Sequence, residues 1–139
     1  MTALVLVAPG SEEIETVAIV DTLVRGGIEV VLASCGPTGA RQICASRGVQ
    51  IVADCHLDEL TTCDFELIVV PGGLPGSEVI RDTPLAIDLL REQAALGRWR
   101  AAICAAPAVV LLHHDLLGDA SATCHPGFQA RLPAAQLST

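Results

Sequence analysis

The 139-residue sequence contains no lysine and no tyrosine, and its only aromatic side chains are two phenylalanines and one tryptophan. Without lysine the chain cannot form a Schiff base with a carbonyl substrate or with pyridoxal phosphate. The scarcity of aromatic rings argues against a surface on which nucleic-acid bases stack. The net charge of -8 leaves no positive surplus to neutralise a phosphate backbone. We therefore expect neither lysine-based catalysis nor a nucleic-acid partner.

Long apolar runs and nucleotide-binding glycine motifs are also missing. No apolar stretch approaches the roughly 20 residues that a membrane-spanning helix needs. No basic segment followed by an apolar run and a small-residue cleavage site opens the chain. Gly72, Gly73 and Gly76 lack the G-x-G-x-x-G spacing, and no Walker A motif is present. We expect a cytoplasmic protein without membrane contact and without a nucleotide or other cofactor.

Six cysteines are present, but none of them forms a C-x-x-C pair. In a cytoplasmic α/β chain, such cysteines are typical of reduced thiols rather than of a disulfide framework. A zinc site would need Cys55–His56, Cys63 and Cys124–His125 to gather. Because close pairs of ligands are missing, we expect no metal.

Short β-rich runs alternate with helical segments, which predicts one α/β domain over residues 1–139. Apolar runs of this length are typical of parallel strands covered on both faces, and Ser11 is the expected cap of the first helix. Residues 42–45 and 49–53 are expected to pair as a hairpin. The other expected strands span residues 3–8, 29–34, 67–70, the run entering Cys104, and 121–124, and the expected helices span 11–25, 84–97 and 106–112.

Cys104 ends a short apolar run, and a proline-containing helical start follows it at once. This order predicts a sharp strand-to-helix corner of the kind that presents a nucleophile. A helix N-terminus favours thiolate over thiol. The alternative is a buried structural cysteine at the end of a core strand. In open α/β sheets, ligands bind beyond the carboxyl ends of the strands, and the loops Pro9–Glu12, Pro71–Gly73 and Cys104–Ala105 are expected there.

Six motifs in order over essentially the whole chain resemble the ThiJ/PfpI superfamily, in the branch of the Parkinson-disease-associated protein deglycase and bacterial YajL. The motifs span residues 8–15, 25–28, 46–49, 70–73, 101–107 and 124–126. The resemblance implies a flavodoxin-like sandwich and a homodimer. Ala105 follows the cysteine where protease-like members carry histidine, which makes protease activity less favoured. Family chains continue beyond this one, so we expect it to lack the family's C-terminal strand and helix, and a separate C-terminal fragment of the same polypeptide is an expected partner.

The resemblance also implies roles for individual residues. Cys104 corresponds to the reactive cysteine, Glu15 to the carboxyl group that hydrogen-bonds it, and His125 to a nearby histidine. The expected main-chain donors are Gly72, Gly73 and Ala105, and the expected dimer-facing arginines are Arg25 and Arg47. Independently of the family, a carboxyl group beside a thiolate is expected to be protonated and to donate to the sulfur. The alternatives are that Glu15 is a solvated first-turn acid and that His125 is an ordinary loop residue.

The resulting hypothesis is a cofactor-independent glyoxalase or protein deglycase that acts on 2-oxoaldehydes or their adducts during oxidative and carbonyl stress. Cys104 would attack the aldehyde carbon, Glu15 and His125 would move protons, and two main-chain N–H groups would hold an oxyanion. An alternative is an oxidative-stress sensor with redox-dependent chaperone activity, based on oxidation of the same cysteine. A third is a folding-assistance subunit in which the cysteine has no role.

Overall fold

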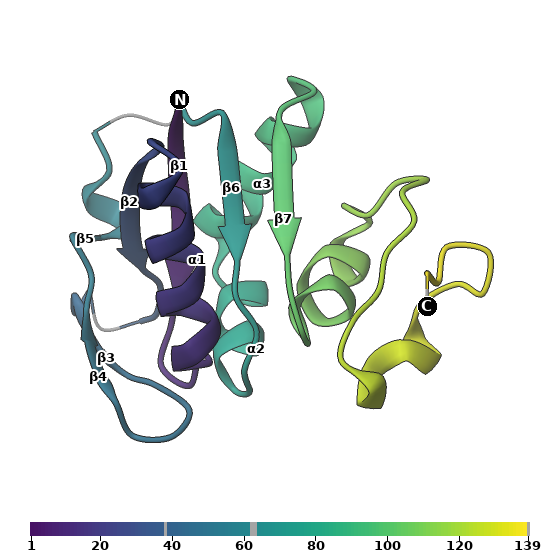
Figure 1. Cartoon of the computed structure of the whole chain (residues 1–139), viewed down its shortest axis with the longest axis horizontal. Coiled ribbons are helices and arrows are strands. Elements are labelled where there is room, and N and C mark those ends of the chain that lie inside the picture. Colours follow the sequence, from purple (N-terminus) through teal and green to yellow (C-terminus); the bar gives the residue numbers. More distant parts are fainter. Residues whose placement is uncertain (38, 62–63, 139) are drawn as a thin grey trace.

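Parallel strands form the centre of the computed structural model, which describes residues 1–37, 39–61 and 64–138. The five-stranded sheet has the order β5-β2-β1-β6-β7 (Figure 1), and all its neighbouring strands are parallel. The strands are β1 (Thr2–Val7), β2 (Glu29–Ser34), β5 (Cys55–His56), β6 (Leu67–Val70) and β7 (Trp99–Ala102). The expected α/β architecture, with a parallel flavodoxin-like sheet, is confirmed.

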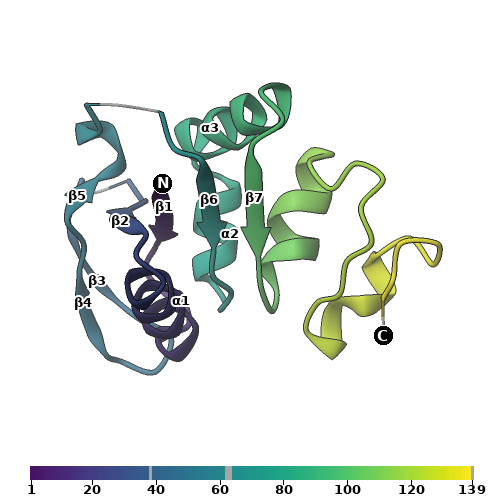
Figure 2. The same cartoon turned by 45° about the horizontal axis from the view of Figure 1, so that its top comes forward.

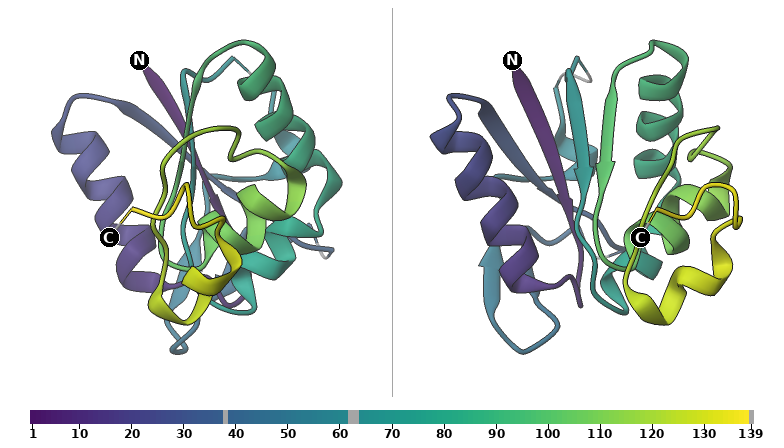
Figure 3. Two further views of the ribbon diagram at one scale, coloured as in Figure 1. Left: turned by 90° about the vertical axis from the view of Figure 1, so that its right-hand side faces the viewer. Right: turned by 45° about the vertical axis from the view of Figure 1, so that its right-hand side comes forward.

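Helices cover both faces of this sheet. α1 (Glu13–Arg25) lies on one face, whereas α2 (Gly76–Arg81) and α3 (Pro84–Ala95) lie on the other (Figures 2 and 3). A π-helical turn at Pro107–Leu111 lies on the same side as α2 and α3. Shorter 3-10 turns occur at Leu57–Glu59, Leu112–His114 and Pro126–Arg131.

β1 is buried over most of its length because it lies in the middle of the sheet. Residues 3–7 have no exposed surface, as expected for an apolar strand with helices over both of its faces. The main core fills the space between the sheet and the helices α2 and α3, and it includes Leu4, Leu6, Ile68 and Leu90. This packing fixes the carboxyl ends of β1 and β6 side by side.

A two-stranded antiparallel hairpin, β3 (Gln42–Cys44) and β4 (Gln50–Val52), lies outside the main sheet. The expected pairing of these two segments is confirmed. Its turn is tied to the start of α1, because the Ser46 N–H donates to the Ser11 carbonyl oxygen at 2.8 Å. The hairpin therefore brings residues 45–49 to the carboxyl-end edge of the sheet.

Two details of the expected fold are wrong, and one helix was not expected. Ser11 is not the helix cap: its hydroxyl accepts the Ala8 N–H, and the Glu12 carboxylate caps α1 by accepting the Glu15 N–H at 2.7 Å. Residues 121–124 form no strand but a single bridge between Ala122 and Leu137, because within the described residues their pairing with residues 136–138 is limited to Ala122. α2 went unpredicted because it is short.

The order in which the chain adds strands to the sheet reverses between β1 and β6. From β1 it proceeds to β2 and β5, and then it returns to β6 and β7 on the other side. In open α/β sheets a ligand site lies at such a switch point, beyond the carboxyl ends of the strands. The loops that follow β1 and β6 meet there, since the Glu12 N–H donates to the Gly72 carbonyl oxygen at 3.0 Å. Across the described residues, we find no helix that is long and apolar enough to span a membrane.

Candidate active site at the carboxyl end of the sheet

Cys104 occupies a sharp corner directly after β7. Its φ angle is 60°, a conformation that residues other than glycine rarely adopt, and Asp115 is the other such residue in the described part of the chain. The corner is pinned on its strand side, where the Ile103 N–H donates to the Val70 carbonyl oxygen. Such strained backbone persists where the surrounding structure holds it, and it is common at catalytic nucleophiles. The expected elbow is therefore present.

Three glutamates at the start of α1 have three different partners. Glu12 caps the helix. Glu13 is buried, and its carboxylate accepts the Ser46 hydroxyl at 2.7 Å and the Arg47 N–H at 2.8 Å. Glu15 accepts the Gly72 N–H at 2.7 Å and forms a side-chain hydrogen bond with Cys104. The first turn of α1 thus caps itself, anchors the hairpin turn and places a carboxyl group against the sulfur.

Main-chain N–H groups surround the Cys104 sulfur. Those of Gly73 and Ala105 hydrogen-bond to it, one from the loop after β6 and one from the elbow itself. The Gly72 N–H, also expected as a donor at the site, donates instead to Oε2 of Glu15. The structure therefore brings Cys104, Glu15, Gly73 and Ala105 together, with Gly72 supporting the carboxyl group.

The pKa of the Cys104 thiol is raised above its usual value. Burial is the main cause, and the hydrogen bond and negative charge of Glu15 act in the same direction. The N–H groups of Gly73 and Ala105 oppose this shift by favouring the thiolate. The surroundings thus shift the balance of Cys104 toward the thiol, whereas the helix N-terminus led us to expect a shift toward the thiolate.

Gly72 allows this close approach because it has no side chain. A Cβ atom at this position would lie 2.6 Å from the Cβ atom of Cys104 and 2.7 Å from Oε2 of Glu15. Real Cβ atoms do not come this close to other heavy atoms. The Pro71–Gly73 loop is therefore the contact surface on which the thiol and the carboxyl group meet.

His125 reaches the site through the main chain. Its N–H donates to the Cys104 carbonyl oxygen at 2.7 Å, which ties the segment after residue 124 to the elbow. The Nδ1 atom accepts the Gly127 N–H at 3.1 Å, so the neutral ring carries its proton on Nε2. His125 also lines the same cavity as Cys104. The ring is thus set to donate rather than to accept a hydrogen bond there.

The cavity at this site has a volume of about 560 Å³. Cys104, Glu15, His125 and Arg47 all line it, together with Phe128. Arg47 reaches it because Glu13 holds the hairpin turn. Sequence reasoning missed Glu13 and Ser46, since their contact joins residues 33 positions apart and no local pattern reports it.

Arg25, the other expected dimer-facing arginine, lies at the far end of α1. It pairs with Asp21 at 2.7 Å, and its side chain is 78% exposed. Within one chain the structure therefore does not bring Arg25 to the cavity.

The remaining described cysteines are free thiols in different surroundings. Burial raises the pKa of Cys35 to about 12 and also raises the pKa of Cys124. Cys44 is exposed and lies outside the cavity. Cys63, considered for a zinc site, lies outside the described residues, and no three potential ligands gather within them.

Comparison with known proteins places this geometry in context. Residues 1–139 match the DJ-1/PfpI family. Protein DJ-1 homolog B of Arabidopsis thaliana is 42% identical over 129 residues, which are 93% of this chain and 29% of that protein. The glutathione-independent glyoxalase DJR-1.2 of Caenorhabditis elegans is 36% identical over 124 residues, 88% of this chain and 63% of its own length. The solved structure of oxidized Toxoplasma gondii DJ-1 has a TM-score of 0.95 and 41% identity, covering 99% of this chain and 74% of that one. The chain thus spans less than two thirds of the length of both curated relatives.

Proposed function

The chain belongs to the DJ-1/PfpI family, and from this premise we propose that it is a cofactor-independent, cysteine-dependent glyoxalase or deglycase that acts on 2-oxoaldehydes or their adducts. The observation that carries the proposal is the strained Cys104, hydrogen-bonded to Glu15 and to two main-chain N–H groups. A relative that is named as a glutathione-independent glyoxalase supports this reaction class. The biological setting that we propose is protection against carbonyl and oxidative stress.

The first step is attack of the Cys104 sulfur on the aldehyde carbon. Glu15 removes the thiol proton as the sulfur–carbon bond forms, which is how an adjacent base activates a weak nucleophile. The aldehyde oxygen gains the electron pair of the broken π bond. In this proposal the N–H groups of Gly73 and Ala105 stabilise the developing oxyanion. Glu15 then passes the proton it took from the thiol to this oxygen, which gives a neutral hemithioacetal and restores the carboxylate.

In the second step the substrate rearranges internally. Glu15 takes the proton from the former aldehyde carbon and returns it to the neighbouring carbon. The hydroxyl proton of the hemithioacetal passes to the ketone oxygen, to which Nε2–H of His125 donates a hydrogen bond. The former aldehyde carbon is oxidised to a thioester and the ketone carbon is reduced to an alcohol. No external redox agent is consumed, because the two changes balance within one molecule. Water then cleaves the thioester, which releases the 2-hydroxy acid and restores the thiol.

The size of the cavity supports substrates larger than free methylglyoxal. Its volume of about 560 Å³ falls within the range of sites that hold drug-sized ligands. A three-carbon aldehyde would leave most of this space filled with water. Adducts of 2-oxoaldehydes with amino-acid side chains are therefore included in the proposed substrate class, which is the deglycase form of the same chemistry.

The direct test is turnover of methylglyoxal to lactate by the wild type and by Cys104→Ser. We expect the variant to lose turnover to the background level while keeping the wild-type circular dichroism spectrum, because a serine hydroxyl beside Glu15 is a much weaker nucleophile than sulfur. Cys44→Ser is the matched control, since it replaces an exposed thiol outside the cavity. Turnover that survives in Cys104→Ser would contradict the proposal.

A second candidate function is oxidation sensing by the same cysteine, coupled to chaperone activity. The half-buried Cys104 has N–H donors that would also bind sulfinate oxygens, and the solved Toxoplasma gondii relative is described as oxidized. Limited peroxide treatment followed by peptide mass analysis distinguishes the two. Oxygen added first at Cys104, together with suppression of client aggregation and no aldehyde turnover, would favour the sensor.

We also propose a homodimer in the cytoplasm. Three large apolar side chains on α1 are exposed, Ile14 by 74%, Val17 by 58% and Val24 by 55%. Burial of such a surface against a second copy is a common route to symmetric dimers. The free thiols among the described residues suit a reducing compartment. Light scattering after size exclusion tests the dimer, and Val17→Glu is expected to shift it to a monomer.

A further inference from the structure

The Cys104 cavity has a charged part and an apolar part. Its charged side chains come from the start of α1 and from the hairpin turn. Its two large apolar side chains are Leu74, in the loop after β6, and Phe128, in the 3-10 turn Pro126–Arg131. The hairpin and this turn lie on opposite sides of β6 (Figure 1). The proposed reaction uses residues of the charged part, and it leaves the apolar part without a role.

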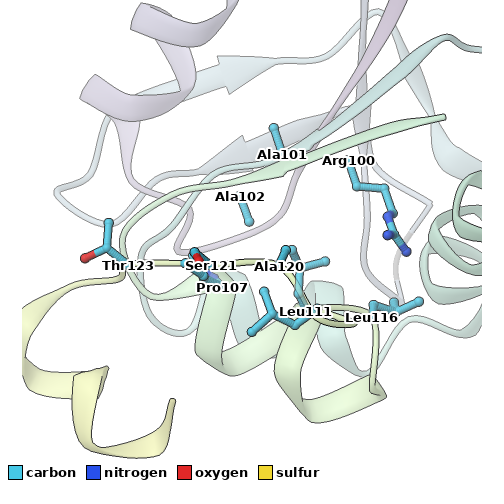
Figure 4. A pocket seen from close by; sticks show the side chains of 11 residues that line it. Arg100, Ala101, Ala102, Pro107, Leu111, Leu116, Ala120, Ser121 and Thr123 are labelled. Atoms are coloured by element: carbon cyan, nitrogen blue, oxygen red, sulfur yellow. The ribbon is translucent and has the colours of Figure 1, made fainter. Parts of the chain in front are cut away.

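The apolar part is distinct from another cavity, which lies beside β7. That cavity has a volume of about 360 Å³, and Leu111 and Leu116 are among the residues that line it (Figure 4). None of its lining residues also lines the Cys104 cavity. Its lining contains no cysteine, histidine or carboxylate within the described residues. We therefore look for contacts with the substrate only around Cys104.

Main-chain hydrogen bonds tie Phe128 to the nucleophile. The His125 N–H donates to the Cys104 carbonyl oxygen at 2.7 Å, and the Phe128 N–H donates to the His125 carbonyl oxygen at 2.8 Å. The rings of His125 and Phe128 also meet in an edge contact, with their centroids 6.1 Å apart. Phe128 is half-buried and packs against the main core and against the smaller cluster that contains Leu132. The ring is thus held in place before a substrate binds.

Part of the Phe128 ring and much of Leu74 remain open to a ligand. The guanidinium carbon of Arg131 lies 4.8 Å from the centroid of the Phe128 ring and covers one of its faces. Leu74 directly follows Gly73, whose N–H bonds to the Cys104 sulfur, and its side chain is 46% exposed. An apolar group that covered both side chains would be favoured in proportion to the apolar area removed from water.

The proposed reaction determines which end of the substrate faces this apolar part, and the inference below rests on that proposal. The aldehyde carbon lies at the Cys104 sulfur, and its oxygen lies at the N–H groups of Gly73 and Ala105. The ketone oxygen accepts from His125. The group bonded to the ketone carbon therefore extends past His125, where the ring in contact with the imidazole is that of Phe128.

We propose that Phe128 and Leu74 form an apolar subsite that selects 2-oxoaldehydes with an aromatic group on the ketone carbon. Phenylglyoxal represents this class, and addition of one water in the proposed reaction converts it to mandelate. Aromatic rings prefer edge-to-face or offset contacts, which the uncovered part of the Phe128 ring can make. Methylglyoxal carries only a methyl group at this position and would leave the subsite unfilled.

The experiment measures kcat/KM for phenylglyoxal and for methylglyoxal in the wild type and in Phe128→Ala. The ratio of the two values is compared between variants, because the two aldehydes differ in their intrinsic reactivity. We expect this ratio to fall about tenfold in Phe128→Ala, the scale on which a hydrophobic pocket discriminates between substrates. The fall should come from a higher KM for phenylglyoxal, while kcat for methylglyoxal stays unchanged.

Further variants keep the test valid if Phe128→Ala does not fold, since Phe128 also packs against the core. Phe128→Leu keeps an apolar side chain but removes the ring, and Leu74→Ala shortens an exposed side chain. Both are expected to lower the ratio about threefold, a smaller share of the same discrimination. Leu85→Ala is the matched control, because Leu85 is a 38% exposed leucine on α3 that does not line the cavity. Its ratio should equal that of the wild type.

Product binding separates this inference from the proposed function, because it requires no turnover. Mandelate and lactate share a carboxylate and a hydroxyl group and differ in the ring. In an NMR titration of the wild type, we expect mandelate to bind about tenfold more tightly than lactate and to shift the amide signals of Leu74 and Phe128. Phe128→Ala should remove the difference in affinity.

The outcomes of these measurements differ for the two proposals. Selective mandelate binding without turnover of either aldehyde would support the subsite and contradict the proposed function. Turnover with the same ratio in the wild type, Phe128→Leu and Leu74→Ala, together with equal affinities for mandelate and lactate, would overturn the subsite while the proposed function stands.

Discussion

Burial raises the pKa of both the Cys104 thiol and the Cys35 thiol, yet the surroundings of the two differ. Around Cys104 the nearby main-chain groups have partners: Gly72 donates to Glu15, Gly73 and Ala105 donate to the sulfur, and His125 donates to the Cys104 carbonyl oxygen. Cys35 lies in the main core, where burial raises its pKa to about 12. The Cys104 thiol is thus held beside a carboxyl group and N–H donors, whereas the Cys35 thiol packs in the core.

This difference separates a thiol that is placed for chemistry from one that packs the core. A site that must attack a carbonyl benefits from donors that are already fixed, because they cost no reorganisation during the reaction. A structural cysteine buried in apolar surroundings is inert. Variants at the Cys104 site are therefore expected to change turnover or stability.

The largest effect is expected for turnover in Glu15→Gln. Glutamine fills the same space but cannot accept the thiol proton, so kcat/KM for methylglyoxal should fall by about 100- to 10,000-fold, the usual contribution of a general base. Glu12→Gln is the matched control, because it removes the same charge from the same helix turn but leaves the contact with Cys104. Equal losses of turnover in the two variants would show that Glu15 acts only through charge.

The next effect is on stability, in Gly72→Ala. The added methyl group would lie 2.6 Å from Cβ of Cys104, so the loop or the elbow must shift. Such overpacking typically costs about 1–3 kcal/mol in the free energy of unfolding, which urea denaturation measures. Gly26→Ala is the control, because its nearest contacts are 3.3 and 3.4 Å and its φ angle is an ordinary -75°. Similar losses of unfolding free energy in both variants would show that the Pro71–Gly73 loop has no special role in packing.

A pH-dependent effect is expected at the hairpin turn that forms one side of the cavity. The Ser46 hydroxyl bond lowers the pKa of Glu13 below its usual value of 4.5. A lowered pKa in the fold means that this anchor stabilises the protein above the usual pKa and is lost as the pH falls through the lowered one. The Arg47 amide proton shift should therefore titrate with a midpoint below 4.5. A midpoint above 4.5, or the same titration in Glu13→Gln, would contradict the claim that the Glu13 carboxylate holds the hairpin turn.

The smallest effect is expected in Arg25→Gln. The ion pair with Asp21 is exposed and joins residues four apart on α1, so its loss should cost about 0.3–0.5 kcal/mol in the free energy of unfolding. Turnover should not change, since Arg25 lies far along α1 from the cavity. A large fall in turnover would instead show that Arg25 reaches the active site of a second copy.

Local signals in the sequence predicted much of this molecule. The apolar run of β1 predicted a strand buried on both faces, and the run that ends at Cys104 predicted the corner. Both depend on residues that are adjacent in the chain. The loops that carry Glu12 and Gly72 were expected at one edge of the sheet because parallel strands end together.

Contacts between distant segments were not predictable in this way. The Glu13–Ser46 bond joins α1 to a turn 33 residues away, and a row of acids at a helix start does not show which of them is buried. Residues 121–124 have the composition of a strand, but a strand also needs a neighbour along its length, and in the described residues they pair only at the bridge between Ala122 and Leu137. The direction of the Cys104 pKa likewise depends on burial and on the position of Glu15. Sequence reasoning had expected the helix N-terminus and a protonated Glu15 to favour the thiolate.

The central claim, that Glu15 acts as a carboxylate base on a thiol, is tested most directly by the pH dependence of Cys104 alkylation. The measurement follows iodoacetamide addition to the Cys104 peptide by mass spectrometry in the wild type and in Glu15→Gln. Because the Glu15 hydrogen bond and charge raise the pKa of Cys104, Glu15→Gln is expected to move the labelling midpoint to lower pH while turnover is lost. A wild-type midpoint well below the ordinary thiol value of about 8.5 that moves to higher pH in Glu15→Gln would contradict the claim. That result would show that a protonated Glu15 stabilises a preformed thiolate.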